Sequence, residues 1–170
     1  GEHRYTRRFG GSSDDRAYDV AVDSQGQAVI VGRFEGSMPL SGQLVDAAAS
    51  GAIFVLKVDA SGDEVFGRRF GGDTEQGAHG VAVDSRDQIV VSGYYEGAPS
   101  FGATALPATG LREPNIALLK LDSAGKHVWS RGFDVVGDQD TGYANRGWRR
   151  VAIGAADEIL LTGFVKGDLA

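Results

Sequence analysis

A stretch of 17 residues that occurs three times constrains the fold of this chain more than any other sequence feature. Ten of the 17 residues of Val81–Gly97 are identical to those of Val20–Gly36, which lies 61 positions earlier. A looser third copy covers Val151–Gly167. A unit that recurs in this way buries its apolar face by stacking on its neighbours, so we expect a row of repeated supersecondary units.

Aligning the copies gives four short strands in each repeat. They are β-branched and aromatic, and turn residues separate them. The strands are expected at 20–23, 28–34, 53–59 and 65–70 in one repeat, and at 81–84, 89–95, 116–122 and 128–133 in the next. Asp23 and Asp84 open the first turns, where a carboxylate accepts hydrogen bonds from turn amides, and we expect Gly26 and Asp87 in the left-handed conformation.

Four-stranded meanders that repeat about every 60 residues are typical of β-propeller blades. The sequence therefore predicts an all-β fold, a β-propeller segment of four-stranded antiparallel blades with two complete blades and partial blades at both ends. Within residues 1–170, this prediction places an outer strand and crossover in 1–15, blades in 16–70 and 77–133, and the first two strands of a further blade in 147–170.

Eleven strands close no propeller, since known propellers have about four to eight four-stranded blades. We therefore expect a segment of a longer repeat chain. Its terminal blades would expose flat apolar faces, so the isolated chain is expected to associate.

Four motifs occur in a fixed order along the chain. They are Arg-Phe-Gly-Gly (69–72), Gly-Val-Ala-Val-Asp-Ser (80–85), Val-Val-Ser-Gly-Tyr-Tyr-Glu-Gly (90–97) and Leu-Leu-Lys-Leu-Asp-Ser-Ala-Gly (118–125). In this order they resemble the SBBP family of bacterial β-propeller repeats, and the blade pattern is similar to a longer NHL-type blade. The resemblance implies a binding or scaffolding module of an exported protein at the cell surface, in the periplasm or outside the cell.

Composition limits the partners of the chain. A formal charge of −6 and a pI near 5.0 argue against nucleic acid or an anionic membrane surface as the main partner. No apolar run approaches the roughly 20 residues that cross a bilayer, and the absence of cysteine excludes disulfides and thiolate metal sites. The expected partners are the remaining blades of a longer chain or other copies of this one, together with an unknown carbohydrate or protein ligand.

The variable loops between repeats are expected to carry any ligand site. Trp148 replaces an alanine of the other copies at the entrance to an inner strand, where it would stack on a sugar ring or pack its own long loop; packing is the favoured interpretation. Tyr18, His79 and Arg149 share one aligned position near the same end of the axis. They would line either a ligand site or a hydrated axial channel.

The crossover before the third copy contains Asp138 and Asp140, whose spacing matches part of a calcium-binding loop. Turn capping is the favoured role for both carboxylates because no bidentate glutamate follows. No cofactor is expected, with calcium as the alternative.

The chain contains no recognisable catalytic constellation, so we predict a non-enzymatic module and assign no catalytic residues. The alternative is a propeller hydrolase or lyase with a metal or carbohydrate site near the axis, in which residues such as His79, Asp138, Asp140 and Arg149 take part and further blades complete the site. A third class, a purely structural spacer, predicts no ligand at all. Lys57 and Lys120 recur in the third strands, which favours a structural role over Schiff-base chemistry; we expect them to extend over the blade edge, for example towards Asp59 and Asp122.

Overall fold

The computed structural model describes residues 2–3, 5–47, 50–102, 104–108, 115–133, 135–136, 150–162 and 168–169. Every regular element in these ranges is a β-strand, so the predicted all-β class is confirmed. None of the described residues belongs to a helix that is long and apolar enough to cross a membrane.

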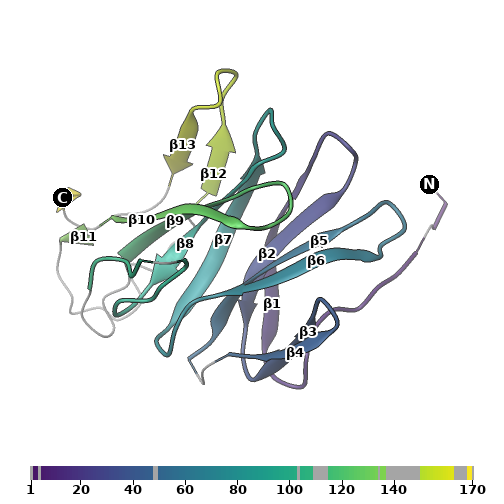
Figure 1. The fold of residues 1–170 in the computed structure, drawn as a ribbon, viewed down its shortest axis with the longest axis horizontal. Helices are drawn as coiled ribbons and strands as arrows, with labels where there is room; N and C mark the ends of the chain where they lie inside the picture. The colour runs from purple at the N-terminus through teal and green to yellow at the C-terminus, as the bar shows by residue number, and fades with distance from the viewer. Residues whose placement is uncertain are drawn as a thin grey trace.

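Two four-stranded antiparallel sheets form the body of the molecule (Figure 1). The strands of the first sheet, in spatial order, are β1 (Asp15–Val22), β2 (Ala28–Phe34), β5 (Ala52–Val58) and β6 (Glu64–Phe70). Those of the second sheet are β7 (Gln76–Val83), β8 (Ile89–Tyr95), β9 (Asn115–Leu121) and β10 (His127–Phe133). Each sheet is a meander in chain order, as a propeller blade requires.

Three strand pairs accompany these sheets. The described part of the third repeat is the hairpin of β12 (Arg150–Ile153) and β13 (Ile159–Thr162). The others are the hairpin of β3 (Ser37–Leu40) with β4 (Gln43–Asp46) and the antiparallel pair of β11 (Val135–Val136) with β14 (Asp168–Leu169). The β3–β4 hairpin lies in the loop between the second and third strands of the first blade and was not predicted.

The sheets stack side by side with their first strands adjacent. β7 packs against β1 and β2 on one side and against β12 on the other, and Figure 1 shows the three units side by side. The first strands of the units, β1, β7 and β12, are called the inner strands, and the fourth strands, β6 and β10, the outer strands. One apolar core fills the space between the first two sheets, and a second core lies between the second sheet and the β12–β13 hairpin. This arrangement is that of consecutive propeller blades.

Aromatic side chains near the outer strands lie on glycine turns of the following blade. A Cβ atom added to Gly125 would lie 2.6 Å from the ring of Phe66. A Cβ atom added to Gly62 would likewise lie 2.5 Å from the ring of Tyr5. Residues 5–14 form no strand. Tyr5 nevertheless occupies the place that Phe66 occupies one repeat later.

The turns of the inner hairpins also contact one another. The amide and hydroxyl of Ser24 donate to the carboxylate of Asp87 at 2.9 and 2.7 Å, and those of Ser85 donate to Asp157 at 3.0 and 2.6 Å. Asp87 and Asp157 both have positive φ angles, of 59° and 60°. The predicted left-handed turn position is thereby confirmed at Asp87, and it also provides a contact between blades.

The recurrent lysines lie in ion pairs that were not predicted. Lys57 lies 2.7 Å from Asp23, and Lys120 lies 2.8 Å from Asp84. The expectation that these lysines extend towards Asp59 and Asp122 is therefore wrong. The partner is the carboxylate at the end of the first strand, which also accepts two turn amides as predicted.

Burial opposes the ionisation of Asp23, but the Lys57 ammonium and two turn amides outweigh it and hold the pKa of this carboxyl below its ordinary value. The pKa of Asp84 is lowered in the same way, with Lys120 as the cation. The side chains of Lys57 and Asp23 are only 3% and 0% exposed. Each blade thus contains a desolvated ion pair beneath its first turn.

Candidate functional site

The inner strands carry β-bulges at the two aligned positions that the sequence singled out. Tyr18 and His79 are the residues skipped in the pairing of β1 with β2 and of β7 with β8. Opposite each bulge stands a glycine, Gly32 or Gly93, where a Cβ would collide with the backbone of the first strand. A bulge turns its extra side chain out of the regular alternation, so the two repeats present Tyr18 and His79 in the same way.

The two bulges bring the predicted residues together. The rings of Tyr18 and His79 meet edge to face with centroids 5.1 Å apart, and the ring of Tyr94 lies tilted against His79 with centroids 5.2 Å apart. The Tyr94 hydroxyl donates to Glu75 at 3.1 Å. His79 is only 7% exposed, so this cluster stacks aromatic rings between two blades.

Asp19 follows Tyr18 in β1, and its carboxylate contacts residues of the second and third repeats. One carboxylate oxygen accepts the Val81 amide of the second blade at 3.0 Å, and the other lies 2.9 Å from the Arg150 guanidinium of β12. Asp19 and Arg150 were not predicted as functional residues. Their only sequence signal is that each is a charged residue directly after the aligned position of Tyr18, His79 and Arg149.

The other predicted site residues lie outside the described residues. They are Trp148 and Arg149 of the ligand-site prediction and Asp138 and Asp140 of the calcium prediction. Within the described ranges, no group of three or more His, Asp or Glu side chains is placed to hold a metal ion.

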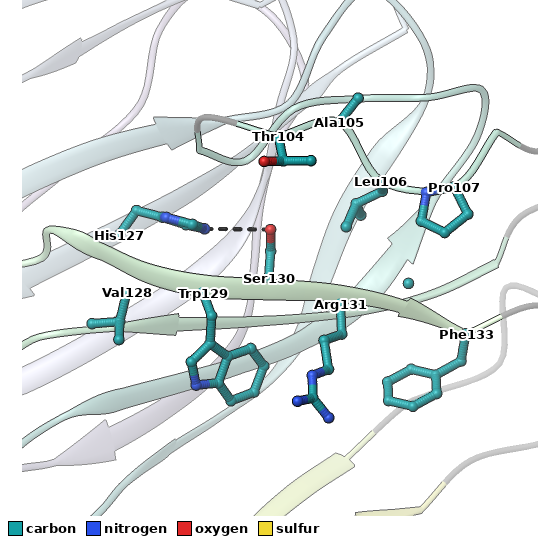
Figure 2. A pocket seen from close by; sticks show the side chains of 11 residues that line it. Thr104, Ala105, Leu106, Pro107, His127, Val128, Trp129, Ser130, Arg131 and Phe133 are labelled. Atoms are coloured by element: carbon teal, nitrogen blue, oxygen red, sulfur yellow. Dashed lines mark hydrogen bonds between the residues drawn. The ribbon is translucent and has the colours of Figure 1, made fainter.

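A groove along β10 is a second candidate site, and sequence reasoning missed it. It has a volume of about 590 Å³ and is lined by the whole strand His127–Phe133 and by the loop Thr104–Pro107. Figure 2 shows the loop on one side of the strand, with Trp129, Arg131 and Phe133 on the other. The groove therefore follows the edge of β10, and its only sequence signal was the long loop before β9.

Within the groove, polar and aromatic contacts fix several side chains. Ser130 and His127 approach each other at 3.3 Å between hydroxyl and ring nitrogen (Figure 2). The Arg131 guanidinium lies over the Trp129 ring at 5.6 Å, as Arg68 lies over Phe66 at 5.1 Å in the first blade. The groove thus combines an apolar wall with one cationic group, the Arg131 guanidinium.

Fold and repeated contacts together define a β-propeller-type repeat protein. No protein-family model matches the chain. Among curated proteins, the chain is similar to an uncharacterized WD repeat-containing protein of Acanthamoeba polyphaga mimivirus, with 26% identity over 127 residues. The match covers 65% of this chain and 9% of that protein. The likeness to a WD-repeat protein agrees with a propeller-type repeat.

Proposed function

We propose that the chain is a non-enzymatic β-propeller module that binds and scaffolds other molecules, and that it belongs to an exported, cell-surface or extracellular protein of the SBBP type. One observation carries the proposal: the charged side chains that recur from repeat to repeat serve the architecture. Asp23 and Lys57, and likewise Asp84 and Lys120, are paired beneath turns. Stacked blades then leave the varied loops and outer rims for recognition.

Further blades, from a longer chain or from other copies, are the proposed structural partners. The leading face of the first blade exposes Val20 and Val22, which are 58% and 62% exposed. The equivalent residues of the second blade, Val81 and Val83, pack into the core shared with the first blade. A preceding blade would cover the exposed pair in the same way.

An assay for turnover and ligand binding tests the proposed function. The purified chain is applied to a glycan array and to a panel of hydrolase and lyase substrates, with Trp148→Ala and Arg149→Ala variants beside it. We expect saturable binding without turnover, and weaker binding in these variants. Turnover that His79→Ala abolishes would favour the enzymatic alternative and overturn the proposal.

Calcium dependence is tested separately, because Asp138 and Asp140 remain the proposed ligands of that alternative. The melting temperature is measured with calcium and with a chelator, in the natural chain and in an Asp138→Asn, Asp140→Asn variant. We expect no difference, as turn-capping carboxylates require. A calcium-dependent rise that the variant loses would establish the metal site.

A further inference from the structure

The outer strands β6 and β10 hold the same place in their blades but differ at their free edges. At the edge of β6, the Ser41 hydroxyl from the tip of the β3–β4 hairpin accepts the Gly67 amide at 2.8 Å and donates to the Gly67 carbonyl at 3.1 Å. Arg68 donates to the same carbonyl at 2.9 Å. Both edge groups of Gly67 are thereby satisfied, and the edge of β6 is closed to another strand at this point.

The edge of β10 is open at the equivalent residue. Ser130 pairs with Leu119 as Gly67 pairs with Leu56 one repeat earlier, so its amide and carbonyl also point away from the sheet. The loop residue aligned with Ser41 is Gly102, which has no hydroxyl. Among the described residues, none bonds to these two groups of Ser130. An unpaired donor and acceptor on an edge strand form a template for a further strand.

The groove beside this edge has room for the side chains of such a strand. Leu106 and Pro107 form its apolar wall on the loop side (Figure 2). The loop is held in place by the Tyr95 hydroxyl, which donates to the Pro107 carbonyl at 3.1 Å. Because alternate side chains of a strand point to the same face, every second residue of an added strand would enter the space between loop and β10.

Charge indicates what this strand carries. The described lining of the groove contains Arg131 and His127 and no carboxylate. The equivalent Arg68 already has partners within the protein, since its guanidinium also donates to the Ala124 carbonyl of the next blade at 3.2 Å. The Arg131 side chain makes no hydrogen bond or ion pair within the described residues and contacts the Trp129 ring. A carboxylate of an incoming strand would complete this site.

We propose that the free edge of β10 binds an extended, acidic segment of a partner protein, which adds to the second blade as an outer strand. This inference rests on the proposed binding function and names its surface and partner class. Backbone hydrogen bonds at Ser130 supply the pairing, Leu106 and Pro107 receive apolar side chains, and Arg131 selects acidic ones.

Two blocked heptapeptides test the proposal, one with valine alternating with glutamate and one with valine alternating with lysine. Binding to the full 170-residue chain is measured by fluorescence anisotropy, and amide hydrogen exchange locates the contact. We expect the glutamate peptide to bind at least about tenfold more tightly than the lysine peptide. We also expect it to protect amides of β10 and leave those of β6 unchanged.

Three variants sharpen the test. Arg131→Glu should reverse the preference in favour of the lysine peptide, while Arg8→Glu makes the same charge change at an exposed residue outside the groove and should alter nothing. Ser130→Pro removes the outward amide and should abolish binding of both peptides. The melting temperature of Ser130→Pro is measured as well, to show whether this variant is folded. If it is unfolded, the result of Arg131→Glu decides whether the proposal holds.

Three results would overturn the proposal. The first is an unchanged preference in Arg131→Glu, and the second is bound peptide without protection of β10. The third is protection of β10 that appears without peptide and rises with protein concentration, because the occupant would then be a second copy of the chain. Failure of the proposed non-enzymatic function is a different result, namely substrate turnover that depends on His79.

Discussion

At the scale of single residues, the ion pair of Lys57 and Asp23 makes the sharpest prediction. Both side chains are almost fully removed from water, so Lys57→Met leaves a buried carboxylate without its cation. We expect a loss of about 3–5 kcal/mol in the free energy of unfolding, measured by urea denaturation. Lys120→Met is the matched control and should cost less, because the Lys120 side chain is 15% exposed. Equal losses would contradict this interpretation.

The lowered pKa of Asp84 predicts how stability changes with pH. A carboxyl whose pKa is depressed in the folded state contributes stability above its unfolded pKa of about 3.9, and this contribution is lost as the pH falls through the folded pKa. In Asp84→Asn the contribution is absent at every pH. The stability difference between the natural chain and the variant should therefore be largest near neutral pH and shrink below about pH 4. Urea unfolding from pH 7 to acid measures it, and a constant difference would refute it.

Sequence reasoning succeeded for residues whose partners are local. The roles of Asp23 and Gly26 followed from turn chemistry within a few residues, and the structure confirms both. The partner of Lys57 was assigned wrongly because Asp59 is near in sequence, whereas Asp23 is brought near by the pairing of β2 with β5. The β10 groove was missed for the same reason, since a loop and a strand distant in sequence form it.

At the scale of elements, the contact between an outer strand and the next blade can be tested with two glycines. Gly125 and Gly26 have nearly the same φ, 78° and 77°, but an added Cβ meets the Phe66 ring at Gly125 and nothing within 4 Å at Gly26. Alanine at either position lowers the free energy of unfolding by about 1–2 kcal/mol, because it adopts the left-handed conformation with strain. Gly125→Ala should lose about 1–3 kcal/mol more, because Phe66 must move.

Chemical denaturation of the two variants gives the comparison directly. The Gly26→Ala variant is the control for backbone strain alone. If the two substitutions destabilise the chain equally, Phe66 does not pack against the turn of the following blade.

The strand spans show which signals are readable from sequence. β2 and β8 have the predicted bounds, because β-branched and aromatic runs between turns leave little choice. β1 and β7 begin five residues earlier than predicted, since their first halves contain polar residues and glycine in place of the β-branched or aromatic run that marks a strand. The β3–β4 hairpin escaped prediction because its four-residue strands include Pro39.

At the scale of the whole molecule, the two ends of the blade row are complementary. The leading face exposes Val20 and Val22, and the trailing hairpin exposes Leu160, whose equivalent Val90 is fully buried one repeat earlier. Contact between unlike faces joins copies head to tail, which yields rings or open chains. We therefore predict concentration-dependent association in size-exclusion chromatography with light scattering.

Charged variants of each face test this prediction. A Val20→Glu, Val22→Glu variant loses the leading face, a Leu160→Glu variant loses the trailing face, and each alone should be largely monomeric. An equimolar mixture should form dimers, because each variant retains the face that the other lacks. A mixture that stays monomeric, or variants that associate as the natural chain does, would show that copies meet elsewhere.

Several contacts between blades join a side chain of an earlier repeat to a turn of the next repeat. The earlier repeat supplies the Ser24 donors and the Phe66 ring, and the later one supplies Asp87 and the Gly125 turn that receive them. Lys57 likewise reaches forward to the Ser123 carbonyl at 3.3 Å. On the ribosome the amino-terminal repeat emerges first. Each blade therefore completes these contacts only after the following blade has been synthesised. Completion of the fold would then advance along the nascent chain one repeat behind translation.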